Sequence, residues 1–222
     1  MYPQSDSHVH LIQLSRWPII GKVKTRLISS LGPEGAFQVH CELVGRTFKT
    51  LLESGVGQVY LLWDSLPVDK VFPEGAAGLS KPENVCFGLQ RGQDLGERMM
   101  NACRDSFQVV ERVILVGSDC PDLSSDYLAK AAEALRVAPL VLGPAEDGGY
   151  VLIGMRYDID DWAQLFQKID WGTAYVLEQT LERAQAASIP YELLPTLWDV
   201  DYPEDYVRYK KKPHQSAGEE SF

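Results

Sequence analysis

The chain has 222 residues, and its 31 acidic side chains outnumber its 21 basic ones, which gives a formal net charge of −10. This length fits one large domain with a sizeable core. The acidic balance argues against a nucleic-acid binder, which needs a basic face for phosphates, and against docking on an anionic membrane.

Strands and helices are expected to alternate along the chain. The pattern predicts strands over residues 9–14, 58–63, 85–89, 112–116, 140–142, 150–153 and 191–194. It predicts helices from near Pro33 to about residue 54, and over 95–107, 124–135, 173–187 and 203–209, with Ser124 or Ser125 as the cap of the helix over 124–135. A Pro- and Gly-rich stretch over 66–82 is expected to be a loop. The alternation predicts an α/β fold with three α/β/α layers around a mostly parallel mixed sheet.

The remaining composition favours a cytoplasmic protein. The apolar runs are far shorter than the ~20 residues that span a bilayer, and the polar start of the chain lacks the apolar stretch of a signal peptide. The four cysteines are isolated, as expected for reduced thiols. We expect one domain over residues 1–222, with a core from about residue 9 to 208 and a polar tail over 210–222.

Ligands of such sheets bind outside the carboxyl ends of the strands. This rule selects the loops over 15–26, 64–70, 90–94, 117–123 and 143–149 as the places where the chemistry is expected.

The first of these loops is basic. Residues 7–33 contain no acid, although the second half of the chain, 112–222, carries 19 acidic and only 10 basic side chains. A glycine would allow a tight turn with exposed backbone N–H groups, and Lys and Arg supply charge to a phosphate. We predict that five residues form a cradle for a diphosphate: Gly21, Lys22, Lys24, Thr25 and Arg26. The spacing is not that of a Walker A loop, and a solvated basic loop is the alternative.

Carboxylates after the central strand point to a metal ion. Asp119 follows the strand over 112–116, and carboxylates there can hold a hard, octahedral Mg²⁺ or Mn²⁺ together with water and substrate phosphate. For Asp122, three residues later, we favour the plainer function of turning the chain into the next helix. Asp199 and Asp201 are two apart in an extended segment, so they lie on the same side and could share a cation with Asp119.

Two further loops give weaker signals. Asp147, Gly148 and Gly149 could bring the backbone close to a ligand, with Asp147 accepting a proton or binding sugar hydroxyls, although the same residues are typical of a hairpin turn. Asp94 and Arg98 open the helix over 95–107 near the same crevice, where a nucleotide contact and an ordinary helix cap are about equally favoured.

Together, these motifs resemble the bacterial GT-A type family of glycosyltransferase-like proteins, also called radical-SAM or selenodomain-associated transferases. The resemblance spans about residues 9–208 and is carried by the segments 21–27, 94–99, 117–123, 143–150, 171–173 and 199–201. It implies the nucleotide-diphospho-sugar transferase fold, whose wider superfamily includes molybdenum-cofactor and 2-phospho-lactate guanylyltransferases. It also implies that Asp119 and Asp201 hold the metal. The sequence departs from many nucleotidyltransferases, because it lacks their Leu-x-Gly-Gly-x-Ser-x-Arg loop.

The combined expectation is an Mg²⁺- or Mn²⁺-dependent transferase that acts on a nucleotide diphospho-sugar. Asp119 and Asp201 would hold the metal, with Asp199 in or near its shell, while Lys22, Lys24 and Arg26 would neutralise the leaving diphosphate. Asp147 is the candidate for acceptor binding or for the general base. The expected partner is a small-molecule nucleotide or nucleotide sugar, and the acceptor is left open. Two alternatives stay open: a nucleotidyltransferase that releases pyrophosphate from a nucleoside triphosphate, and a nucleotide-binding relative without turnover.

Overall fold

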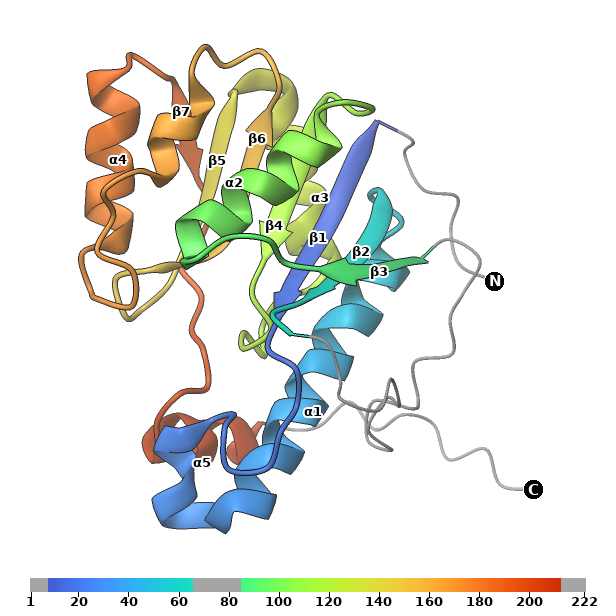
Figure 1. Cartoon of the computed structure of the whole chain (residues 1–222), viewed down its shortest axis with the longest axis vertical. Coiled ribbons are helices and arrows are strands. Elements are labelled where there is room, and N and C mark those ends of the chain that lie inside the picture. The colour runs from blue at the N-terminus through green and yellow to red at the C-terminus, as the bar shows by residue number, and fades with distance from the viewer. Residues whose placement is uncertain (1–7, 66–84, 213–222) are drawn as a thin grey trace.

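The computed structural model describes residues 8–65 and 85–212. Within them, seven strands form one sheet in the order β3-β2-β1-β4-β6-β5-β7 (Figure 1). The strands are β1 Val9–Ser15, β2 Gln58–Trp63, β3 Val85–Leu89, β4 Arg112–Val116, β5 Leu140–Pro144, β6 Tyr150–Arg156 and β7 Tyr191–Leu193. Only β6 runs antiparallel to its neighbours among these strands, so the predicted mostly parallel mixed sheet is confirmed.

Helices cover both faces of the sheet and complete the three predicted layers. On one face, α1 (Ile28–Ser54) and α3 (Ser125–Val137) pack on Leu11, Leu61 and Ile114. On the other, α2 (Leu95–Ser106), the 3₁₀ helix η2 (Trp162–Phe166) and α4 (Val176–Ala186) pack on Ile12 and Leu115. Alternate residues of β1 therefore serve the two layers of the core, as the period of a strand requires.

A third cluster of buried side chains ties the C-terminal segment to the start of α1. Trp198, Val200 and Tyr209 pack against Leu27 and Leu43, and Tyr209 comes from the last helix, α5 (Pro203–Lys211). Figure 1 shows α5 lying beside the beginning of α1, below the edge of the sheet. This packing brings residues near 200 back to the loop that follows β1.

Some predicted boundaries were wrong, although that of the first helix was not. The helix expected near Pro33 is preceded by a helical turn that starts at Ile28, but Gly32, with φ of 70°, interrupts it, so the uninterrupted helix begins at Pro33 as predicted. The helix expected from Thr173 starts at Val176; the Thr173 hydroxyl instead donates to Asp170 O at 2.7 Å in the preceding turn. The polar tail expected from residue 210 starts later, since α5 continues to Lys211, and the rest of the tail lies outside the described residues, as does the expected loop over 66–82.

Other local predictions were confirmed. Asp94 caps α2 by accepting a hydrogen bond from Glu97 N at 2.8 Å, and Ser124 caps α3. The loop over 145–149 joins β5 and β6 as a hairpin, which the sequence offered as the plainer interpretation of that loop.

Among the described residues, no helix is long and apolar enough to cross a membrane.

Candidate functional site

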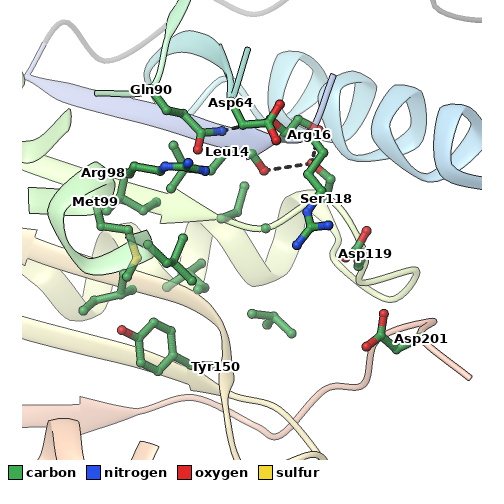
Figure 2. A pocket seen from close by; sticks show the side chains of 18 of the residues that line it. Leu14, Arg16, Asp64, Gln90, Arg98, Met99, Ser118, Asp119, Tyr150 and Asp201 are labelled. Carbon is green, nitrogen blue, oxygen red and sulfur yellow. Dashed lines mark hydrogen bonds between the residues drawn. The ribbon is translucent and has the colours of Figure 1, made fainter. Parts of the chain in front are cut away.

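A cavity of about 660 Å³ lies at the edge of the sheet where β1, β2, β3 and β4 end (Figure 2). Ser15, Asp64, Gln90 and Asp119 line it, and each stands at the end of one of these strands or just beyond it. Because β6 runs the other way, its first residue, Tyr150, reaches the same edge. The cavity therefore has the position that ligands occupy in open α/β sheets.

The loop after β1 folds back over this cavity. Trp17 N donates to the Asp64 carboxylate at 2.7 Å, and the buried His40 ring lies 3.0 Å from Arg16 O. Lys24 adopts the left-handed backbone conformation, with φ of 46°, which reverses the chain before the short 3₁₀ helix η1 (Thr25–Leu27). Non-glycine residues seldom adopt this conformation, and here it directs Lys24 inward.

Asp119 is positioned by a buried hydrogen-bond network. Its neighbour Ser118 donates to Leu14 O at 3.0 Å, lies 2.6 Å from the Ser15 hydroxyl and accepts from Gln13 Nε2 at 3.0 Å. These contacts fasten the end of β4 to β1, and the next side chain, Asp119, stands at the cavity rim with 42% of its surface exposed.

Asp201 reaches the same rim from the other end of the chain. Val200 N donates to Asp119 O at 3.0 Å, which joins the late segment directly to the end of β4. The Asp205 carboxylate accepts from Asp201 N at 3.1 Å and Tyr202 N at 2.7 Å, and so fixes the entry into α5. Figure 2 shows Asp119 and Asp201 close together at one end of the cavity.

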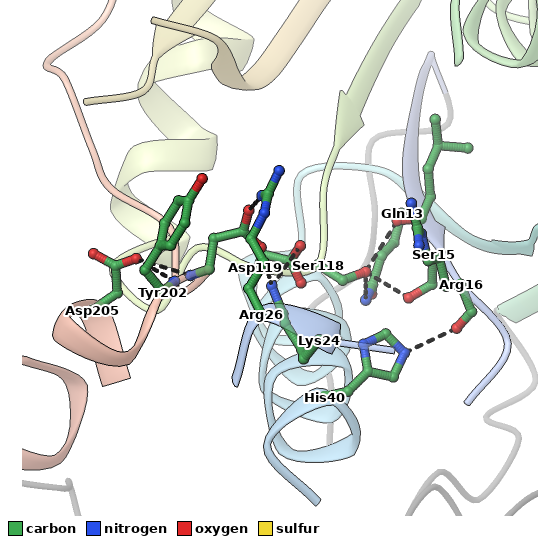
Figure 3. A network of polar contacts seen from close by, with 12 residues as sticks. Gln13, Ser15, Arg16, Lys24, Arg26, His40, Ser118, Asp119, Tyr202 and Asp205 are labelled. Atoms are coloured by element: carbon green, nitrogen blue, oxygen red, sulfur yellow. Dashed lines mark hydrogen bonds and ion pairs between the residues drawn. The ribbon is translucent and has the colours of Figure 1, made fainter. Parts of the chain in front are cut away.

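The two carboxylates share one cation, the Lys24 ammonium. Figure 3 shows Lys24 directed toward Asp119. Lys24 Nζ lies 2.9 Å from Asp119 Oδ2 and 3.3 Å from Asp201 Oδ1, and the Lys24 side chain is only 3% exposed. Burial by itself lowers the pKa of Lys24, but the charges and hydrogen bonds of the two carboxylates outweigh it, so the pKa is raised and the amine stays protonated. Arg26 forms a second ion pair with Asp201 and stacks on the Tyr202 ring at 4.9 Å.

Asp199 lies in a strongly negative environment. Burial and the charges of Asp147, Asp119 and Asp201 raise its pKa to about 6, while Lys24 acts in the opposite direction. The hairpin, the loop after β4 and the late segment thus bring four carboxylates into one electrostatic neighbourhood. Asp147 itself is exposed and accepts from Gly149 N at 2.9 Å.

The residues present fit a divalent cation held by two carboxylates. Across residues 8–65 and 85–212, no group of three or more His, Cys, Asp or Glu side chains has the arrangement of a complete metal site. Two oxygens from Asp119 and Asp201 nevertheless converge on one ammonium, which occupies the place of a cation. Mg²⁺ and Mn²⁺ commonly take one or two carboxylates and complete their shell with water and substrate phosphates, so this donor set is sufficient.

The structure gathers some of the predicted site residues around the cavity and leaves others outside it. Those that line it are Lys24, Thr25, Arg26, Asp94, Arg98, Asp119 and Asp201. The predicted residues that are absent from its described lining are Gly21, Lys22, Asp147, Gly148, Gly149 and Asp199. The basic loop thus contributes its beginning and its end to the cavity, whereas its glycine turn is absent from the described lining.

Sequence reasoning also missed residues of this cavity. It gave the histidines no function, yet His40 lines the cavity, and burial lowers the pKa of its ring despite the hydrogen bond to Arg16 O. Gln90 donates from one amide nitrogen to Ser15 O at 2.9 Å and Leu62 O at 2.8 Å, which leaves its oxygen for other partners. His40 lies on the buried face of α1, and no pattern among its neighbours in the sequence indicates that it contacts the loop after β1.

Asp122 lies in the turn that leads from β4 into α3, as expected, and Ser124 caps that helix. The Asp122 carboxylate accepts from Trp198 Nε1 at 2.7 Å and forms an ion pair with Lys212. Burial raises the pKa of Asp122, but the hydrogen bonds from Lys212 and Trp198 outweigh it and lower the pKa. This side chain therefore fastens the late segment to the loop after β4.

Comparison with known structures defines the class of fold as that of nucleotide-diphospho-sugar transferases. A protein of Desulfovibrio desulfuricans G20, for which nucleotide-diphospho-sugar transferase activity is suggested, is 32% identical with a TM-score of 0.84 over 96% of this chain and 90% of that one. A Methanothermobacter nucleotidyl transferase shares the fold at 14% identity and a TM-score of 0.63, over 92% of this chain and 96% of that one. The manganese complex of Rv0371C from Mycobacterium tuberculosis H37Rv also shares it, at 12% identity and a TM-score of 0.56 over 91% and 97%.

Residues 47–173 match the family described as "Uncharacterized protein conserved in bacteria (DUF2064)", and the chain belongs to this family. No curated protein matches the chain.

Proposed function

We propose that this protein is a divalent-metal-dependent transferase that uses a nucleotide diphospho-sugar as donor, as the resemblance to the GT-A type transferases implies. The observation that carries the proposal is the convergence of Asp119 and Asp201 on one cation at the rim of a cavity that Lys24, Arg26 and Arg98 also line. The activity suggested for the Desulfovibrio relative and the manganese bound by the Mycobacterium structure support it.

In the proposed reaction, a hydroxyl oxygen of the acceptor forms a bond to the anomeric carbon of the donor sugar. The bond from that carbon to the diphosphate oxygen breaks, and its electron pair leaves with the nucleoside diphosphate. Mg²⁺ or Mn²⁺, when bound by Asp119 and Asp201, would supply Lewis-acid stabilisation of the leaving diphosphate. Lys24 and Arg26 would bind the same phosphates, and Asp147 would accept the acceptor proton.

A nucleotidyltransferase is the second candidate, and the shared fold with the Methanothermobacter enzyme favours it. The same cavity would then hold a nucleoside triphosphate, and a nucleophilic oxygen of the acceptor would displace pyrophosphate from the α-phosphorus. The two reactions differ in their leaving group: a nucleoside diphosphate in the first and pyrophosphate in the second.

The test is a thermal-shift panel of nucleoside diphosphates, nucleoside triphosphates and nucleotide sugars, with and without Mn²⁺. The proposal expects metal-dependent stabilisation by at least one nucleotide sugar, followed by release of the nucleoside diphosphate when that donor is incubated with the protein. Pyrophosphate release from a triphosphate would identify the second candidate instead. If no nucleotide raises the melting temperature in either condition, both proposals fail.

A further inference from the structure

We propose that Lys24 is an exchangeable occupant of the metal position: it bridges Asp119 and Asp201 when the cavity is free, and moves to the phosphates of a diphosphate-bearing ligand when the metal ion binds. This inference rests on the proposed function for the identity of the metal and ligand. It adds that metal and diphosphate bind together, with neither bound tightly alone.

The first step is that Lys24 and a divalent cation need the same atoms. Asp119 Oδ2 and Asp201 Oδ1 are 2.9 and 3.3 Å from Lys24 Nζ, and they are the carboxylate oxygens that face the shared position. The other oxygen of Asp201 is engaged by Arg26. A metal ion held by both carboxylates would therefore meet the ammonium directly, and two cations at one position repel each other.

The second step is that Lys24 cannot simply be displaced. Its side chain is 3% exposed, and a buried ammonium that loses its anionic partners is strongly destabilising. Metal alone would leave Lys24 without its two carboxylate partners and next to a new double positive charge. The metal can enter easily only if a new anion reaches Lys24 at the same time.

The third step identifies that anion. Lys24, Arg26, Arg16 and Arg98 all line the cavity, so an anion bound there meets cations from two elements. A diphosphate can contact the metal through one phosphate and a released basic side chain through the other, whereas a single phosphate offers fewer oxygens for both. The long, flexible side chain of Lys24 suits this exchange, since its ammonium is a point charge that adapts to different partners.

The experiment measures Mn²⁺ binding by equilibrium dialysis in three conditions: metal alone, metal with orthophosphate, and metal with pyrophosphate. Pyrophosphate serves as a probe without base or sugar. The wild-type protein is compared with Lys24→Gln and with Lys22→Gln. Lys22 is an exposed lysine of the same loop that does not line the cavity, so its removal controls for the loss of one charge near the metal.

We expect the wild-type protein to bind Mn²⁺ weakly alone and about tenfold more tightly with pyrophosphate, within the usual range of coupling between two sites. Orthophosphate should give a clearly smaller gain. Lys24→Gln should bind Mn²⁺ alone about tenfold more tightly than the wild-type protein, and should gain less from pyrophosphate. Lys22→Gln should bind Mn²⁺ alone like the wild-type protein.

The exchange is refuted if Lys24→Gln binds Mn²⁺ alone no more tightly than the wild-type protein, or if Lys22→Gln shows the same gain. If Lys24→Gln fails to fold, Lys24→Met replaces it. The wild-type protein also tests the coupling by itself, because equal Mn²⁺ affinity with and without pyrophosphate would overturn it. The proposed function fails separately. If pyrophosphate promotes Mn²⁺ binding but no nucleotide does, the donor assignment is wrong while the exchange stands.

Discussion

Asp119 and Asp122 offer a sharp test of the site, because they lie three residues apart in one loop and have different partners. Asp119 faces the cavity and Lys24, whereas Asp122 bonds Trp198 and Lys212 away from it. Replacing each by alanine should separate metal binding from stability. Asp119→Ala should lose the stabilisation by Mn²⁺ but keep most of its stability without metal. Asp122→Ala should keep the stabilisation by Mn²⁺ but lose stability.

The contacts give the expected magnitudes. Asp119 is 42% exposed and Lys24 keeps Asp201 as a partner, so Asp119→Ala should lower the free energy of unfolding by about 1 kcal/mol. Asp122→Ala loses a partly exposed ion pair, worth less than about 1 kcal/mol, and leaves the Nε1 group of Trp198 without its acceptor, which costs about 1–3 kcal/mol. A loss of about 2–3 kcal/mol is therefore expected for Asp122→Ala.

The assay is thermal unfolding with pyrophosphate present, with and without Mn²⁺ at about a hundred times its dissociation constant. Binding at that level adds about 2.7 kcal/mol to the stability of the folded protein. For a chain of this size, each kcal/mol shifts the melting temperature by about 2–4 °C. The wild-type protein and Asp122→Ala should thus gain about 5–10 °C from Mn²⁺, and Asp119→Ala should gain nothing.

Two results would refute the reasoning. If Asp119→Ala keeps the Mn²⁺ shift, the cation is held elsewhere. If Asp119→Ala is as unstable as Asp122→Ala, its carboxylate is structural. Asp122→Asn provides a further control: asparagine can still accept from Trp198 Nε1, so it should lose less than about 1 kcal/mol. Because the folded-state pKa of Asp122 is lowered, its contribution is complete above the ordinary carboxyl pKa and is lost as the pH falls through the lowered value.

Three further substitutions test the hairpin, the basic loop and the core. Gly148→Ala should lower the free energy of unfolding by about 2 kcal/mol, because φ is +88° and the added Cβ would lie 2.2 Å from Ala174 O. Gly21→Ala, at φ of +79° with open space around the added Cβ, should cost only backbone strain of about 1 kcal/mol. Equal losses for the two variants in urea unfolding would contradict this. Burial lowers the pKa of His10 from 6.5, so the unfolded chain binds the proton first and the stability falls as the pH drops below 6.5. The free energy of unfolding of His10→Gln should therefore depend less steeply on pH between pH 7 and 5. An unchanged slope would contradict this.

The sequence predicted the features that depend on neighbours along the chain. The strand over 112–116 and the caps Asp94 and Ser124 follow from short patterns, and the structure confirms them. The placing of Asp119 at the sheet edge follows from one further rule, that the carboxyl ends of parallel strands meet there. The fold class could also be predicted, because the alternation of strands and helices is a pattern along the chain.

The contacts that define the site could not be predicted, because they join distant parts of the chain. Lys24 and Asp201 are 177 residues apart, and Asp122 and Lys212 are 90 apart. Tyr150 reaches the cavity only because β6 is antiparallel, which no local pattern indicates. The basic loop was expected to face phosphate, and the structure pairs two of its cations, Lys24 and Arg26, with the carboxylates expected to hold the metal.

The charge of the cavity gives this arrangement a physical reason. Although the whole chain carries −10, the described lining is balanced between four bases (Arg16, Lys24, Arg26 and Arg98) and four acids (Asp64, Asp94, Asp119 and Asp201). A divalent cation alone, or a diphosphate alone, would leave two uncompensated charges in a partly buried space, which costs free energy. A divalent cation together with a doubly charged diphosphate restores the balance. Electrostatic neutrality therefore favours joint binding, in agreement with the coupling proposed from the position of Lys24 between Asp119 and Asp201.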